Sequence, residues 1–195
     1  AKILFAEAEE NNLGEKAKDE RWARWKKCSL CEQQYHGVVE YALGWGCWKT
    51  YLGRPETDVS RRTAVRTLAI ALSRNGDDET ALAAFEAHLG AERRFFAANW
   101  EERSRDDDIL TAEKQISHCY AHLGRHYEAI TLRRSIYEKR LANHGPMDVN
   151  VLNDAMSLAF SLVSDYFFEE AKTFLRDIIP KSESVLGNQH HNTLA

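Results

Sequence analysis

Two cysteines near the start of the chain have the spacing of a metal-binding turn: residues 25–31 read WKKCSLC. Because two residues separate Cys28 from Cys31, the turn between them can aim both thiolates at one zinc ion. A structural zinc site needs four ligands. A local set would add His36 and Cys47, whereas ordinary packing or surface thiols would bind no metal. We expect no cofactor held by this chain alone and, in the intact protein, zinc at Cys28 and Cys31.

Few other side chains have a pattern that could do chemistry. His118 and His122 lie four residues apart on one face of a predicted helix, where imidazoles could hold a metal or line a binding groove. The acidic residues 106–108 fit the start of a helix better than an acid–base pair. The sequence has no glycine-rich phosphate loop and no Ser, His and Asp in a hydrolase order. We therefore expect no catalytic residues and no enzymatic activity.

The composition is that of a soluble globular protein: of 195 residues, 44% are hydrophobic and 29% are charged. The net charge of −4 gives no electrostatic reason to expect nucleic acid. No stretch reaches the roughly 18 apolar residues of a membrane span. Four cysteines are not a disulfide framework at this length, so a reducing compartment is the default, and the cytoplasm is the default location. Alanine and leucine far outnumber valine and isoleucine, which favours an all-α fold.

An internal repeat of 42 residues organises the second half of the chain. Leu110, Leu152 and Leu194 follow one another at this interval, as do Ala129 and Ala171. A third copy lies around residues 75–81, 48 residues before the copy at Ala129. Because repeats of this length are supersecondary units that bury their apolar faces against neighbours, we expect a stack of similar units.

Each repeat is predicted to be two helices joined by a short turn, because apolar residues recur every 3.6 residues and glycines stand where helices should end. The predicted helix pairs are 58–74 with 77–97, 107–123 with 125–143, and 148–164 with 167–186. They form a repeat domain over residues 53–195, with units at about 57–97, 107–143 and 148–186 and the start of a fourth at 188. Residues 1–52 lack the repeat and are expected to form an N-terminal helical cap. Its helices are predicted over 1–27, with a break near 11–14, and over 36–51. The chain begins at Ala1 inside an apolar-periodic segment, so we expect it to be a fragment.

These hairpins resemble the tetratricopeptide repeat (TPR), in the 42-residue form of kinesin light chains. The resemblance rests on small residues inside the helices and on the linker LGNQHHNTL at residues 186–194. The small residues are Ala69, Ser117 and Ala159 in first helices and Ala81, Ala129 and Ala171 in second helices. The resemblance implies a right-handed superhelical stack whose first helices line a concave groove, and a structural role for His190 and His191.

The register of the first helices predicts which side chains line that groove. The first two hairpins supply basic residues and histidines, and the third supplies polar and apolar side chains. The predicted peptide-binding residues are Arg66, Thr67, Arg74, Lys114, Gln115, His118, His122, Asn153, Ser157 and Phe160, with Ile70 and Met156 as apolar neighbours. Such a groove would favour a peptide with acidic groups at one end and an apolar anchor at the other.

The cysteine segment resembles the end of a RING-CH type zinc finger, which closes on Trp-x-x-Cys-x-x-Cys. The resemblance implies that the other two ligands of this zinc ion come from a Cys-x-Cys upstream. A protein with both halves would be a ubiquitin ligase that uses the repeats as its substrate-binding arm.

The leading functional hypothesis is a non-catalytic scaffold that binds a protein or peptide partner in the concave groove. The first alternative is the substrate-binding arm of a RING-CH type ubiquitin ligase. The second is a structural subunit of a larger assembly that uses its convex face. We expect no nucleic-acid partner and no direct membrane insertion.

Overall fold

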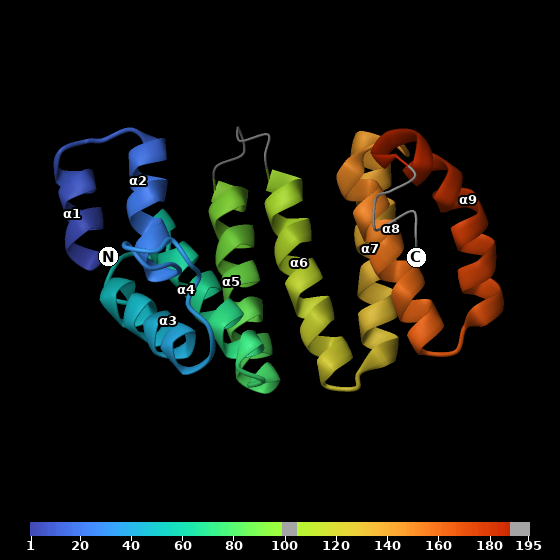
Figure 1. Cartoon of the computed structure of the whole chain (residues 1–195), viewed down its shortest axis with the longest axis horizontal. Coiled ribbons are helices and arrows are strands. Elements are labelled where there is room, and N and C mark those ends of the chain that lie inside the picture. The colour runs from blue at the N-terminus through green and yellow to red at the C-terminus, as the bar shows by residue number, and fades with distance from the viewer. Residues whose placement is uncertain (99–104, 188–195) are drawn as a thin grey trace. The chain divides into compact units, whose positions relative to one another are not determined.

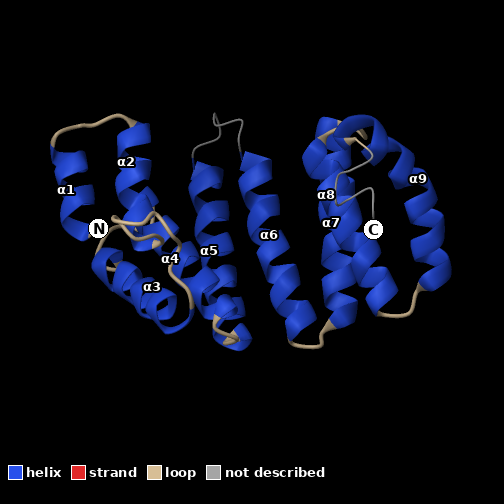
Figure 2. Ribbon diagram, in the orientation of Figure 1, coloured by secondary structure: helices blue, strands red, loops and turns tan. Residues whose placement is uncertain are grey.

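All regular elements in the described part of the chain are helices, so the predicted all-α fold is confirmed (Figures 1 and 2). The structure, a computed structural model, describes residues 1–98 and 105–187. The chain divides into two compact units, Ala1–Trp100 and Glu101–Ala195. An isolated antiparallel bridge joins Lys27 to Gln34 in the first unit. Within the described residues, no helix combines the length and the apolarity needed to cross a membrane.

The helix bounds nearly coincide with those predicted from the sequence. The first unit contains α1 (Lys2–Glu10), α2 (Glu15–Trp22), the 3-10 helix η1 (Ala23–Trp25), α3 (Gly37–Tyr51), α4 (Val59–Arg74) and α5 (Asp78–Ala98). The second unit contains α6 (Arg105–His122), α7 (His126–His144), α8 (Val149–Ser164) and α9 (Phe168–Leu186). The predicted fourth repeat and the linker histidines His190 and His191 lie outside the described residues.

Aspartates fix the starts of two first helices. The Asp58 carboxylate accepts a hydrogen bond from the backbone N–H of Arg61 at 2.9 Å, at the N-terminus of α4. Asp148 plays the same part for α8, where it accepts from the N–H groups of Asn150 and Val151. These side chains satisfy backbone donors that have no partner inside a helix, which explains why the predicted starts are accurate.

The turns between paired helices need a left-handed backbone. Gly76 and Gly124 supply it with φ of 81° and 72°, and glycine adopts this conformation without a steric cost. In the third hairpin the same position is Tyr166, with φ of 66° and an exposed ring. The turn geometry is therefore retained although the glycine is not.

The core of the first unit is aromatic. Phe5, Trp22, Trp25 and Tyr51 cluster there, and the ring centroids of Phe5 and Trp22 are 5.0 Å apart. Ala64 of α4 belongs to the same cluster, so the N-terminal helices and the first hairpin share one core. The predicted domain boundary at residue 52, which follows a change of sequence pattern, stays a prediction.

The core of the second unit follows the repeat. Ala129 and Ala171, which are 42 residues apart, are each 1% exposed at equivalent places on α7 and α9. Leu158 and Leu162 of α8 pack in a cluster with Ala171 and with Ile130 of α7. Small side chains at the repeat positions let neighbouring helices approach closely, as the hairpin prediction requires.

Candidate functional site

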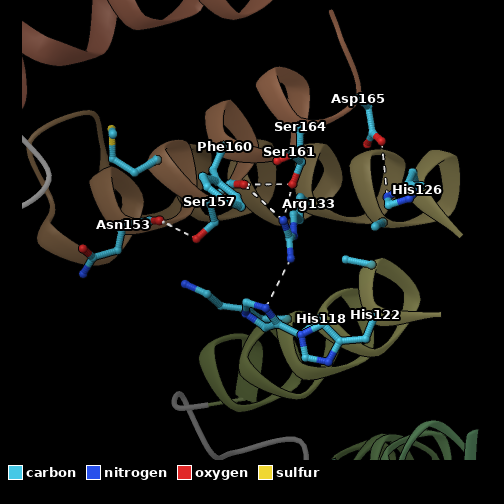
Figure 3. Close-up of a pocket in the computed structure, with 14 residues that line it drawn as sticks. His118, His122, His126, Arg133, Asn153, Ser157, Phe160, Ser161, Ser164 and Asp165 are labelled. Carbon is cyan, nitrogen blue, oxygen red and sulfur yellow. Dashed lines mark hydrogen bonds and ion pairs between the residues drawn. The ribbon is translucent and has the colours of Figure 1, made fainter. Parts of the chain in front are cut away.

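A pocket of about 670 Å³ lies in the second unit, among α6, α7 and α8 (Figure 3). Predicted groove residues from the first helices of both hairpins line it. They are Lys114, His118 and His122 from α6, and Asn153, Met156, Ser157 and Phe160 from α8. Gln115, also predicted on this face, is half-buried and does not line the pocket.

The groove residues predicted in the first unit have other surroundings. Thr67 is buried, and its hydroxyl donates to the carbonyl of Thr63 at 2.8 Å. The Arg74 guanidinium pairs with Glu40 at 2.6 Å, and both side chains line a smaller pocket of about 210 Å³ beside Thr67. Arg66 is exposed and lines neither pocket.

A buried arginine on a second helix, which the first-helix register did not predict, also lines the larger pocket. Arg133 of α7 is 7% exposed. Its Nε donates to Ser117 Oγ at 3.2 Å, and its Nη1 donates to the Ser157 carbonyl at 3.3 Å and to the Ser161 hydroxyl. Its Nη2 lies 3.2 Å from Nδ1 of His118. The guanidinium thus ties α7 to α6 and α8.

His118 is neutral at pH 7. Burial, helped by the positive charges of Arg133 and Lys114, lowers the pKa of this imidazole to about 4. A neutral imidazole nitrogen that faces an arginine N–H must be the acceptor. The proton of His118 therefore sits on Nε2, and His118 adds no charge to the pocket.

A balanced ionic network adjoins the pocket. Lys114 Nζ lies 2.7 Å from Asp154 Oδ1, and Asp154 is 2% exposed. Arg140 pairs with the other oxygen of Asp154, and its Nε lies 3.3 Å from an oxygen of Asp107. Two cations here face two carboxylates, so the charge of Lys114 is largely neutralised inside the protein.

The edge of the pocket offers both an imidazole–carboxylate contact and an apolar ring. His126 Nδ1 lies 3.2 Å from an oxygen of Asp165, and a dashed line marks this contact in Figure 3. The Phe160 side chain is 72% exposed although it belongs to the pocket lining. Because exposed aromatic rings gain when a ligand covers them, Phe160 is the natural apolar contact for a bound chain.

The Cys28–Cys31 segment forms a tight hydrogen-bonded turn in the first unit. The N–H of Cys28 donates to the Gln33 carbonyl at 2.9 Å, and the N–H of Glu32 donates to the Cys28 carbonyl at 3.1 Å. The N–H of Leu30 approaches Cys28 Sγ at 3.4 Å. Backbone N–H groups of Cys31 and Leu30 lower the pKa of the Cys28 thiol. This turn favours a thiolate at Cys28.

The predicted local four-ligand site is not assembled. Cys47 is fully buried in the aromatic core, and burial raises the pKa of its thiol to about 12. Its partners in the predicted set, Cys28, Cys31 and His36, are exposed or half-buried on the segment before α3. Among the described residues, no three His, Cys, Asp or Glu side chains are grouped to hold a metal ion, and this covers His118 and His122 as well.

Comparison with models of protein families and with curated protein sequences gave no match. Solved structures of similar fold exist. BtubC (BKLC) from P. vanneervenii has 16% sequence identity and a TM-score of 0.61, over 79% of this chain and 60% of that one. A putative kinesin light chain from Podosopora anserina with nearly identical TPR-like repeats has 14% identity and a TM-score of 0.61, over 99% of this chain and 78% of that one. The chain therefore spans only part of the length of these proteins, and its fold is similar to TPR-like helical repeats.

Proposed function

We propose that this chain is a non-catalytic interaction module that binds a segment of a partner protein in the pocket among α6, α7 and α8. The observation that carries the proposal is the chemistry of that pocket. One cavity of about 670 Å³ combines a buried guanidinium, imidazoles and a largely exposed phenylalanine ring. Stacked helical hairpins commonly present such surfaces to other chains. The pocket suits a peptide with both a polar and an apolar contact.

The test uses peptides selected from a random displayed library by the native chain. Phe160→Ala is expected to weaken binding of a selected peptide by about ten- to a hundredfold, because loss of a buried aromatic contact costs roughly 1.5–3 kcal/mol. Tyr127→Ala is the matched control, since Tyr127 is 79% exposed in the same unit and does not line the pocket. Equal effects of the two substitutions, or a failure to select any peptide, would count against the proposal.

We also propose a second function, in which the chain is the substrate-binding arm of a RING-CH type ubiquitin ligase. The hydrogen-bonded turn at Cys28 and Cys31 favours it, because N–H groups directed at a sulfur support the thiolate that zinc requires. The remaining ligands would come from another part of a longer protein.

A cobalt(II) titration of the reduced chain tests this second proposal. Thiolate-to-cobalt absorption is expected, and Cys28→Ser or Cys31→Ser should each remove it. Cys47→Ser should not, because that thiol is buried in the aromatic core. Absorption that survives the loss of Cys28, or no absorption at all, would exclude a zinc-binding half-site in this turn.

A further inference from the structure

Arg133 is a buried cation that pairs with no carboxylate in the described part of the chain. Three arginines in the described residues are at most 7% exposed: Arg62, Arg133 and Arg140. Arg62 pairs with Glu92 at 3.1 Å, and Arg140 pairs with Asp154 and Asp107. Among the side chains that the structure describes, no carboxylate is paired with the Arg133 guanidinium.

The groups that do contact Arg133 are all neutral. They are the hydroxyls of Ser117 and Ser161, the Ser157 carbonyl and the uncharged His118 ring. A guanidinium has five N–H donors, and these contacts use four, which leaves one on Nη2. Burial lowers the pKa of Arg133, and only the more distant Asp165 opposes this effect. A buried charge in such a state is costly unless a partner arrives.

The unused N–H belongs to a group that lines the candidate pocket. Arg133 is one of the pocket residues, and Figure 3 shows its guanidinium reaching from α7 towards His118 on α6. Lys114, the other Lys or Arg of the pocket lining, already faces Asp154, and the Asp165 carboxylate lies against the His126 ring. The pocket therefore has room for one more negative charge at Arg133.

We propose that Arg133 binds a carboxylate of the bound partner segment, which is either an Asp or Glu side chain or the C-terminal carboxylate of the partner. This inference rests on the proposed peptide-binding function. A singly charged carboxylate matches the single unneutralised guanidinium, and arginine pairs well with its planar geometry. A doubly charged phosphate fits less well, since the Asp165 carboxylate also lines the pocket and would repel its second charge. Phe160, at the edge, takes an apolar side chain of the same segment.

The test compares synthetic versions of a peptide selected from the random displayed library by the native chain. Each Asp or Glu is replaced singly by Asn or Gln, and the C-terminus is made as acid and as amide. We expect one such change to weaken binding at least tenfold in native protein. Arg133→Gln should weaken binding of the parent peptide to a similar extent. When Arg133→Gln is combined with the sensitive peptide replacement, the loss of affinity should be no larger than for either change alone. Arg134→Gln is the matched control, because Arg134 is the next residue of α7 and pairs with Glu170 at the surface.

The outcomes separate this inference from the proposed function. If no peptide binds, or if binding ignores Phe160, the proposed function itself fails. If peptides bind through Phe160 while no carboxylate replacement changes their affinity, the proposed role of Arg133 is overturned and the proposed binding function stands. Tighter binding of a phosphoserine peptide than of its glutamate counterpart would also overturn it. The peptide-side replacements leave the protein intact, so they decide the matter even if Arg133→Gln does not fold.

Discussion

The two buried arginines of α7 differ in whether a carboxylate partner compensates the cost of burying their charge. Arg140 neutralises Asp154, which is 2% exposed, whereas Arg133 contacts only neutral groups. Loss of Arg140 would leave a buried carboxylate with Lys114 as its remaining cation. Loss of Arg133 would leave only neutral groups, although the serine hydroxyls and His118 would lose a donor.

We therefore expect Arg140→Met to lower the free energy of unfolding of the second unit by about 3–5 kcal/mol. Arg133→Met, at a similarly buried position, should change it by less than about 1 kcal/mol or raise it, because the desolvation cost of an unpaired cation disappears. Hydrogen exchange of the α7 amides measures both. Equal destabilisation by the two substitutions would show that Arg133 does have a compensating charge.

Buried histidines make the protein sensitive to acid. In the first unit, burial is the main cause that lowers the pKa of His88 to about 4, with further lowering from Arg66 and Arg62. The ordinary pKa is about 6.5, so between pH 6.5 and pH 4 the unfolded chain binds more protons than the folded one. The free energy of unfolding must then fall as the pH falls through this window. His118 acts in the same direction in the second unit.

The loss of stability of the first unit between pH 7 and pH 5 should shrink by about 2 kcal/mol in His88→Leu. Denaturation followed by tryptophan fluorescence measures it, because four of the five tryptophans lie in residues 1–52. His36→Leu, which removes an exposed imidazole from the same unit, is the matched control. An unchanged slope in His88→Leu would mean that the folded protein protonates His88 readily.

At the scale of helices, α3 and α4 approach closely at a glycine. A Cβ atom added at Gly44 would lie 2.7 Å from Cβ of Ala71 and 3.5 Å from Cα of Leu68. Two residues further on, a Cβ at Gly46 would lie 3.6 Å from the Trp25 ring, which is an ordinary contact.

Gly44→Ala should therefore lower the free energy of unfolding of the first unit by about 1–3 kcal/mol, because the two helices must move apart. Gly46→Ala should be neutral or stabilise it by up to about 1 kcal/mol, since alanine is the better helix former. Denaturation followed by tryptophan fluorescence compares the two. A stabilising Gly44→Ala would show that α3 and α4 can separate at little cost.

The helices could be predicted from the sequence because their signals are local. Asp58 and Asp148 stand at helix starts, and the 42-residue interval repeats the same buried positions. The α6 and α8 side of the pocket was predicted for the same reason, since residues three and four apart share one face of a helix.

Arg133 was missed because its partners come from two other helices, α6 and α8, and no local pattern shows them. A signal did exist: Arg133 and Arg140 occupy the buried stripe of α7 that also contains Ala129 and Ile136. A charged residue on an apolar stripe indicates either an internal pair or a ligand. Only the three-dimensional contacts show that Arg140 belongs to an internal ion pair and that no described carboxylate pairs with Arg133.

For the whole molecule, the two units carry different chemistry. The first unit contains the hydrogen-bonded turn at Cys28 and Cys31 and an aromatic core, and the second unit contains the pocket of about 670 Å³. The proposed peptide binding therefore belongs to the second unit, and the proposed metal binding belongs to the first. We expect Phe160→Ala to remove only the peptide binding and Cys28→Ser to remove only the metal binding.

The most direct test is an NMR titration of the isotope-labelled chain with a selected peptide. We expect the largest amide shifts on α6, α7 and α8, around Lys114, Arg133 and Ser157, and no shifts in the Cys28–Cys31 turn. Shifts confined to residues 1–98 or to α9 would contradict this expectation, because the bound segment would then lie outside the pocket.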